Sequence, residues 1–130
     1  MRVLIAEDDA LFRRALELLL NSEFEITAVE DGQAAWILLQ EKDHPTLAIL
    51  DWVMPGLSGP DVCRKLRAHQ STAGVYAILL TAKNSAADII AGLRAGADDY
   101  VTKPFESEEL RVRVRIGRRI LEMQEALAEK

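Results

Sequence analysis

The sequence has little of several features that other classes of protein depend on. Its one cysteine, Cys63, has no partner for an internal disulfide bond, which favours a reducing compartment. Its apolar runs, such as residues 75–82, are far shorter than the ~20 residues of a membrane-spanning helix. Acidic residues begin at Glu7, which is too early for a secretory signal peptide. We therefore expect a cytoplasmic protein without a membrane segment.

Aromatic residues are also scarce, and basic residues are outnumbered by acidic ones. Aromatic side chains make up 5% of the 130 residues, and the net charge at pH 7 is −5. The apolar share of 49% is nevertheless enough for a core of Leu, Ile, Val and Ala, which excludes general disorder. The acidic balance argues against a chain that binds nucleic acid along its whole length. A second full domain does not fit within this length.

Short apolar runs alternate with longer amphipathic segments along the chain. The runs predict five strands, at residues 3–6, 24–29, 47–50, 75–81 and 99–102. The amphipathic segments predict five helices, at residues 10–21, 32–42, 59–69, 86–95 and 107–128. In the first helix, we expect the buried face to consist of Leu11, Ala15, Leu18 and Leu19.

This alternation predicts an α/β fold, a doubly wound parallel sheet with helices on both faces. The first, third and fourth strands are the most continuously apolar, so we expect them in the centre of the sheet. The second strand contains Glu25 and Thr27 and the fifth contains Asp99, which places both nearer the edges. In open sheets of this kind, ligands bind at the carboxyl ends of the strands.

Polar residues follow these strands at their carboxyl ends. In chain order they are Glu7, Asp8 and Asp9, then Asp51, then Thr81, then Lys103. Clustered carboxylates repel one another unless a cation is bound. Because the cluster offers oxygen ligands and no His or Cys, it favours Mg²⁺ over Zn²⁺. Mg²⁺ beside a lysine and a hydroxyl is suited to holding a phosphoryl group, which a carboxylate can itself accept.

Each of these residues also has a structural explanation when it is taken alone. Acids before a helix can cap it, and an aspartate after a strand can form a turn. Thr81 and Lys103 taken singly are ordinary structural or solvated residues. The structural explanations do not account for the gathering of all of them at one edge of the sheet.

Four stretches of the chain stand out as a set. They are residues 3–9 (VLIAEDD), 50–59 (LDWVMPGLSG), 80–82 (LTA) and 95–105 (AGADDYVTKPF). In this order and spacing, the chain resembles the receiver domain of two-component response regulators, over residues 2 to about 120. The resemblance implies a flavodoxin-like (βα)5 fold with strand order 2-1-3-4-5. We expect a receiver domain over residues 1–120 and an extension of the last helix over residues 121–130, as a linker or dimerisation segment.

The resemblance implies a role for each residue of the acidic cluster. Asp51 would be the phosphoacceptor. Glu7 and Asp8 would hold Mg²⁺ together with Asp51 and the backbone carbonyl of Val53. Glu7 stands where many members of the family carry Asp. Asp9 would cap the first helix.

The same resemblance implies roles around the phosphoryl group. Lys103 would pair with its oxygens, Thr81 would form a hydrogen bond with it, and Ala82 would leave room for it. Tyr100 occupies the family's switch position, where an aromatic ring turns inward when Thr81 moves.

Three further residues would shape the loops. Pro104 would form a cis bond that aims the lysine into the crevice, although a trans proline is the default when the family is ignored. Pro55 and Gly56 would shape the loop after the phosphoacceptor.

The implied function is a phosphorylation-activated switch that receives its phosphoryl group from a histidine kinase or phosphotransfer protein. Such a module is no enzyme with an external substrate, although it promotes its own phosphorylation and dephosphorylation. Phosphorylation would shift a pre-existing equilibrium and alter the surface formed by helix 86–95, strand 99–102 and the last helix. That surface would control dimerisation or an output domain.

Three alternative functions differ from this switch in the residues that they require. A Mg²⁺-dependent phosphohydrolase of the haloacid-dehalogenase type needs an acid two residues after its nucleophile, where this chain has Val53. A pseudo-receiver used only for docking would not need the acids, Thr81 and Lys103. A nucleotide-binding flavodoxin-like module would need a Gly-rich phosphate loop after the first strand, which this sequence lacks.

The last predicted helix carries two apolar stripes. One, Leu110, Val114, Gly117 and Leu121, is spaced to face the sheet. The other is left for a partner and consists of Val112, Ile116, Ile120, Met123 and Leu127. A helix of this length spans about 33 Å, so its end should project from the body. We expect a homodimer, either through this helix as a short coiled coil or through the switch surface; a frayed tail is the alternative.

Five arginines without an intervening acid lie in this helix. They are Arg111, Arg113, Arg115, Arg118 and Arg119. Because the segment is neutral overall and no helix-turn-helix follows, we expect no direct nucleic-acid binding by it. We expect some of the arginines to pair with Glu108, Glu109, Asp98 or Asp99, within one copy or between two.

Overall fold

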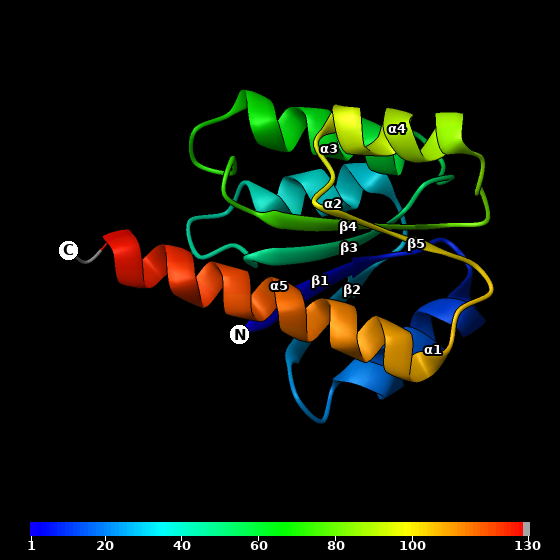
Figure 1. The fold of residues 1–130 in the computed structure, drawn as a ribbon, viewed down its shortest axis with the longest axis horizontal. Coiled ribbons are helices and arrows are strands. Elements are labelled where there is room, and N and C mark those ends of the chain that lie inside the picture. Colours follow the sequence, from blue (N-terminus) through cyan, green and yellow to red (C-terminus); the bar gives the residue numbers. More distant parts are fainter. Residues whose placement is uncertain (129–130) are drawn as a thin grey trace.

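The computed structural model describes residues 1–128 and has strands and helices in strict alternation (Figure 1). In chain order they are β1 (Arg2–Ala6), α1 (Ala10–Leu20), β2 (Glu25–Val29), α2 (Gly32–Leu39), β3 (Leu47–Asp51), α3 (Gly59–Ala68), β4 (Tyr76–Thr81), α4 (Ala86–Ala95), β5 (Asp99–Thr102) and α5 (Ser107–Ala128). All ten predicted elements are confirmed. The largest boundary difference is in α2, which ends three residues early because Gln40 caps it.

The strands form one parallel sheet in the order β2-β1-β3-β4-β5, so the predicted fold class and strand order are confirmed. The side chains of β3 and β4 are buried throughout, whereas those of β2 at the edge are half-buried or exposed. A strand that is covered on both faces needs a continuous apolar run, which is the signal that distinguished the central strands in the sequence.

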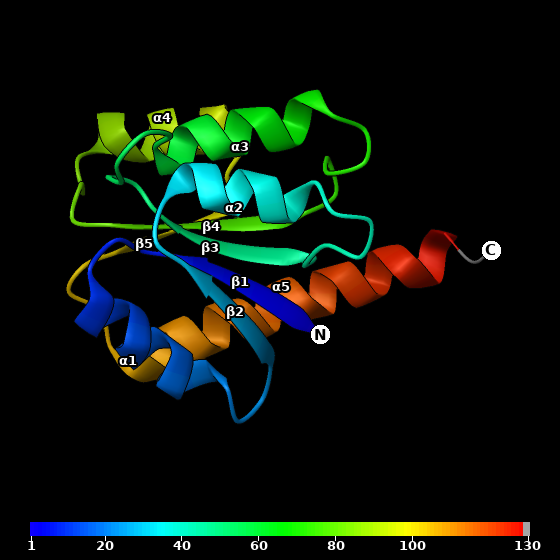
Figure 2. The same cartoon turned by 180° about the vertical axis from the view of Figure 1, so that it is seen from behind.

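Two helices, α1 and α5, cover one face of the sheet, and α2, α3 and α4 cover the other (Figures 1 and 2). Successive residues of β1 point to opposite faces, as the strand period of two requires. Leu4 therefore joins the core beneath α2 and α3, whereas Val3 and Ile5 join the core beneath α1 and α5.

The buried face predicted for α1 is wrong. Leu11 is 86% exposed and Leu18 is 56% exposed, whereas Leu16 and Leu20 are buried. Ala15 is also exposed, and Leu19 is half-buried against the core. The segment contains two overlapping apolar stripes, each with the spacing of a helix. The stripe that begins at Phe12 and includes Leu16 and Leu20 faces the sheet. The side chain of Asp9 caps the helix, as expected, by accepting a hydrogen bond from the Phe12 N–H at 3.0 Å.

The inner stripe of α5 packs as predicted, since Leu110, Val114 and Gly117 are buried. Of the outer stripe, Met123 and Leu127 are 58% and 70% exposed, and Val112 is exposed as well. Ile116 and Ile120 are half-buried, and Ile120 packs against the core. The carboxyl-terminal turns of α5 extend past the sheet (Figures 1 and 2). None of the helices in the described part of the chain has the length and apolar character that a membrane crossing requires.

The arginines of α5 form ion pairs within the chain. The pairs are Arg111–Glu108 at 3.0 Å, Arg113–Asp99 at 3.2 Å, Arg113–Glu109 at 3.8 Å, Arg115–Glu108 at 3.6 Å, Arg115–Glu23 at 2.8 Å and Arg118–Glu23 at 3.5 Å. The partners Glu108, Glu109 and Asp99 were expected. Asp98 instead pairs with Arg67 at 2.7 Å, and Glu23 was not foreseen.

Candidate functional site

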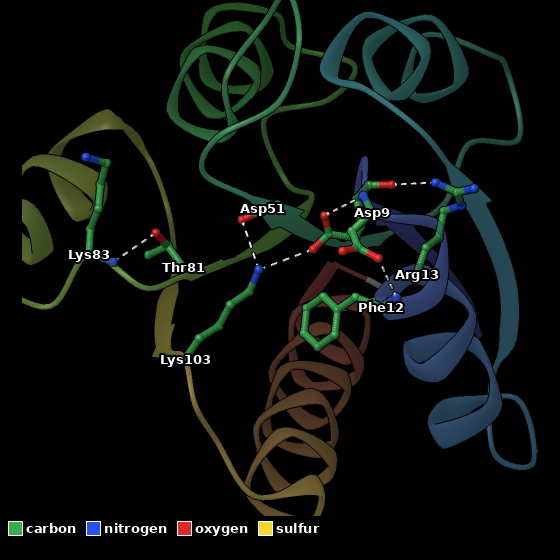
Figure 3. A network of polar contacts seen from close by, with 8 residues as sticks. Asp9, Phe12, Arg13, Asp51, Thr81, Lys83 and Lys103 are labelled. Atoms are coloured by element: carbon green, nitrogen blue, oxygen red, sulfur yellow. Dashed lines mark hydrogen bonds and ion pairs between the residues drawn. The ribbon is translucent and has the colours of Figure 1, made fainter.

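The carboxyl edge of the sheet gathers the polar residues that follow β1, β3, β4 and β5. Glu7, Asp8 and Asp9 follow β1, Asp51 ends β3, Thr81 ends β4, and Lys103 follows β5. In the β3–β4 register, Asp51 lies opposite Leu80, so Thr81 lies one residue beyond it on the neighbouring strand. Figure 3 shows Lys103 reaching across this edge toward Asp51.

Three carboxylates form a compact group at this edge. Carboxylate oxygens of Glu7, Asp8 and Asp51 lie within 4.8 Å of one another. Glu7 is 2% exposed and Asp51 is 9% exposed, whereas Asp8 lies at the surface. Oxygen donors of this kind, two buried and one open to solvent, fit a hard cation such as Mg²⁺, which keeps several waters. The structure therefore brings the predicted acids together, whereas Val53 lies 64% exposed in the loop that follows.

Glu7 has the most perturbed acid–base behaviour of this group. Burial raises the pKa of Glu7 to about 7, and the nearby Asp51 carboxylate adds to the rise. A hydrogen bond from the Asp9 N–H, at 3.1 Å, and the charge of Lys103 act in the opposite direction. A cation bound beside Glu7 would favour the ionised carboxylate and so oppose both of the effects that raise its pKa.

Lys103 supplies the positive charge within this group. Its Nζ lies 3.3 Å from Glu7 Oε1 and 3.4 Å from Asp51 Oδ1. It also lies 4.4 Å from the centre of the Phe12 ring, on α1. The peptide bond between Lys103 and Pro104 is cis.

Two residues of α1 support the site and were missed by the sequence analysis. The Phe12 ring contacts the Lys103 ammonium, and its centre lies 6.0 Å from that of the Phe105 ring. Arg13 Nη1 donates a hydrogen bond to the backbone carbonyl of Glu7 at 2.8 Å. The helix pattern carried no signal for either contact, because both depend on where α1 lies against the loop after β1.

The far side of the edge is built around the loop between β4 and α4. Thr81 is 3% exposed, and its Oγ1 accepts a hydrogen bond from the Lys83 N–H at 3.1 Å. The hydroxyl of Tyr100, on β5, donates to the backbone carbonyl of Lys83 at 2.5 Å. Tyr100 is half-buried, and this burial raises the pKa of its hydroxyl. Ala82 is exposed beside Lys103 on a groove of about 540 Å³ that continues to Phe12 and Phe105.

The loop after Asp51 contains the two residues expected to shape it. Pro55 and Gly56 are both exposed there, and Gly56 has a φ of 77°, a left-handed conformation that favours glycine. Met54 between them and the strand is buried. The Gly59 N–H donates to the Trp52 carbonyl at 2.9 Å and closes the loop at the start of α3.

The family model of the response regulator receiver domain matches residues 3–115 of this chain. This chain belongs to that family. The receiver is 43% identical over 115 residues to the DNA-binding response regulator MtrA of Mycolicibacterium paratuberculosis, covering 88% of this chain and 49% of the relative. It is 47% identical over 116 residues to the sensory transduction protein RegX3 of Mycobacterium bovis, covering 87% of this chain and 48% of that relative. The receiver thus spans about half the length of the curated relatives it matches.

Solved structures resemble the receiver over most of its length. The receiver domain of Francisella response regulator 1452 matches with a TM-score of 0.82 at 32% identity, covering 89% of this chain and 94% of that one. The BeF3-activated DrrB receiver domain matches with a TM-score of 0.79 at 28% identity, covering 89% of this chain and 95% of that one. A receiver domain is a phosphoacceptor module of two-component signal transduction rather than an enzyme with its own substrate.

Proposed function

We propose that this receiver is a phosphorylation-activated switch in which Asp51 accepts a phosphoryl group from a histidine kinase or a phosphotransfer protein. The observation that carries the proposal is the group formed by the three carboxylates and Lys103. Within this group, Asp51 ends the central strand β3, and it lies 3.4 Å from the Lys103 ammonium that Glu7 also contacts.

The transfer requires an attack by Asp51 on the phosphorus of a phosphohistidine. A bond forms between a carboxylate oxygen and phosphorus as the phosphorus–nitrogen bond breaks, and the electron pair of the broken bond returns to the imidazole. Glu7, Asp8, Asp51 and the Val53 carbonyl would hold Mg²⁺, which would supply positive charge beside the phosphoryl group.

Three residues of the chain complete the site. Lys103 pairs with phosphoryl oxygens, because its ammonium is already held at the edge by Glu7 and Asp51. The Thr81 hydroxyl donates a hydrogen bond to the phosphoryl group, since its oxygen accepts from Lys83 and its proton is left to donate. Ala82, with its small side chain, leaves space beside them.

Phosphorylation then shifts the population of Tyr100 positions, because the phosphoryl group draws Thr81 toward it and Tyr100 shares the Lys83 contact with Thr81. The surface that changes is formed by α4, β5 and α5. We propose that this surface controls self-association or an output domain.

The tail of α5 belongs to the same proposal. The receiver covers residues 1–120, and residues 121–130 extend the last helix as a linker or dimerisation segment; residues 129 and 130 of this segment lie outside the described residues. The exposed Met123 and Leu127 favour a second copy as the partner, either here or on the α4–β5–α5 surface.

Two further aspects concern the surroundings of the receiver. Two of the relatives are named for DNA binding or sensory transduction, and the chain spans half their length. We propose that this segment does not bind nucleic acid itself, because acidic side chains neutralise most of the α5 arginines.

We propose a cytoplasmic location, which suits the single cysteine and a kinase donor.

Intact-mass measurement after treatment with acetyl phosphate and Mg²⁺ tests the function. We expect the wild-type chain to gain the mass of one phosphoryl group and Asp51→Asn to gain none. Asp43→Asn, at an exposed loop position, is the matched control and should gain the group as the wild type does. A wild-type chain that gains nothing, or an Asp51→Asn variant that is still modified, would contradict the proposal.

A further inference from the structure

Lys83, in the loop between β4 and α4, contacts three other parts of the site. Its backbone N–H donates to Thr81 Oγ1 at 3.1 Å, which Figure 3 shows, and its carbonyl accepts from the Tyr100 hydroxyl. Its ammonium lies 5.7 Å from the ring centre of Trp52, the residue that follows Asp51. One loop residue thus links the threonine, the tyrosine and the phosphoacceptor strand.

Trp52 and Tyr100 also contact each other. Their ring centres lie 6.1 Å apart with the planes at 72°, an edge-to-face arrangement that aromatic pairs favour. Trp52, Lys83 and Tyr100 therefore form a closed circle of contacts, which we call the Lys83 cluster. Tyr100 is docked when its ring lies against Trp52 and its hydroxyl donates to Lys83.

The side chain of Lys83 makes a contribution that its backbone cannot make. Any residue at this position would offer the same N–H and carbonyl, but the contact with the indole requires a cation. In the described part of the chain, no carboxylate lies within ion-pair distance of the Lys83 ammonium, so Trp52 is the partner that the structure gives it. An exposed cation over an indole shifts a two-state ratio by about two- to fivefold.

We propose that Lys83 is a positioning residue whose ammonium, stacked on Trp52, holds the β4–α4 loop where Tyr100 docks. This inference rests on the proposed function, because the docking of Tyr100 is the equilibrium that phosphorylation of Asp51 is proposed to shift. The lysine biases that equilibrium toward the docked arrangement whether or not a phosphoryl group is bound. It therefore lowers the degree of phosphorylation at which the switch turns on.

Fluorine NMR of protein labelled with 3-fluorotyrosine tests the inference, because the chain has only two tyrosines and Tyr100→Phe identifies the relevant signal. Lys83→Met should lower the ratio of docked to undocked Tyr100 about two- to fivefold. It should also raise the beryllofluoride concentration needed for half-saturation by a similar factor. Lys83→Arg, which restores a cation, should restore both values.

Lys65→Met is the matched control. The Lys65 ammonium lies 5.8 Å from the Trp36 ring centre, so this variant removes an equivalent contact between α3 and α2. Lys65→Met should leave the ratio of docked to undocked Tyr100 unchanged. In a double-mutant cycle, Lys83→Met should have no further effect once Trp52→Leu has removed the ring.

Two results would overturn the inference: a Lys83→Met variant with the wild-type ratio, or a Lys83→Arg variant that behaves like Lys83→Met. Additive effects of Lys83→Met and Trp52→Leu would also overturn it. Failure of the proposed function is recognised separately, because intact-mass measurement on the same variants after treatment with acetyl phosphate and Mg²⁺ reports whether Asp51 is phosphorylated. The ratio of docked to undocked Tyr100, measured without beryllofluoride, tests the role of Lys83 whether or not Asp51 accepts a phosphoryl group.

Discussion

The two sides of the carboxyl edge are held together in different ways. On the side of β1 and β3, the carboxyl groups of Glu7 and Asp51 contact the Lys103 ammonium, and α1 supports them through Phe12 and Arg13. On the side of β4 and β5, Thr81, Lys83 and Tyr100 are joined by hydrogen bonds between uncharged groups and by ring contacts, and residues 82–85 of the loop before α4 are exposed. The charged side suits the binding of a phosphoryl group, and the neutral side suits rearrangement at low energetic cost.

The largest expected effect comes from removing the charge of the first side. Lys103→Met leaves Glu7 and Asp51 without their shared cation, so the rate of phosphorylation by acetyl phosphate should fall by about a hundredfold. Time-resolved intact-mass measurement gives this rate. Lys42→Met, at an exposed position in the loop after α2, should match the wild type. A normal rate for Lys103→Met would show that the lysine is not needed for transfer.

A steric change on the second side should have the next largest effect. A Cβ added at Gly92 would lie 2.9 Å from Tyr100 Cε2 and 2.9 Å from Leu79 Cδ1. Gly92→Ala should therefore displace the Tyr100 ring and lower its docked ratio roughly tenfold, a typical overpacking effect. The variant should remain folded, because alanine favours helix α4.

Fluorotyrosine NMR measures the displacement at Tyr100. Gly74→Ala is the control, since a Cβ at Gly74 would meet nothing within 4 Å. If Tyr100 keeps its position in Gly92→Ala, the docked arrangement does not depend on the missing side chain.

A smaller effect, on thermal stability, is expected from the Arg115–Glu23 ion pair, which lies outside both sides of the carboxyl edge. Arg115 lowers the pKa of Glu23 by donating hydrogen bonds to it. A carboxyl whose pKa is lower in the folded state stabilises the fold above its unfolded pKa, and this stabilisation disappears as the pH falls through the folded pKa. Arg115→Gln should therefore slightly lower the melting temperature at pH 7, and the difference should vanish in acid.

Calorimetry at several pH values checks this prediction. Arg119→Gln is the matched control, because Arg119 is exposed on the same helix and forms no ion pair within residues 1–128. A difference between Arg115→Gln and wild type that persists at low pH would mean that Glu23 is not the group responsible.

The smallest change is expected in the core beneath the switch. Cys63 on α3 is fully buried, and burial raises the pKa of its thiol to about 12. The Cys63 thiol should resist alkylation by iodoacetamide in the native wild type. It should resist equally in Lys83→Met and Gly92→Ala if the structural effects of these substitutions are confined to the β4–β5 side of the edge. Alkylation followed by mass measurement is the check, and the unfolded chain is the positive control. Faster alkylation in either variant would show that the disturbance reaches the core.

Much of the charged side could be predicted from the sequence, and little of the neutral side. Parallel strands bring their carboxyl ends to one edge, so Asp51 and the acids after β1 were placed together by alternation alone. No sequence pattern pointed to Lys83, because its contacts come from its backbone and from the Trp52 ring in the loop after β3. The choice between the two apolar stripes of α1 likewise depended on packing, since both have helical spacing.

Asp51 ends a strand that lies between β1 and β4 and is buried from Leu47 onward. Its position is therefore fixed only after segments from both halves of the chain have paired. A nascent or partly denatured chain has the aspartate but lacks the neighbouring acids and the lysine around it. On the proposed function, phosphorylation of Asp51 would therefore require the folded receiver, so a phosphorylation signal would also report that the molecule is intact.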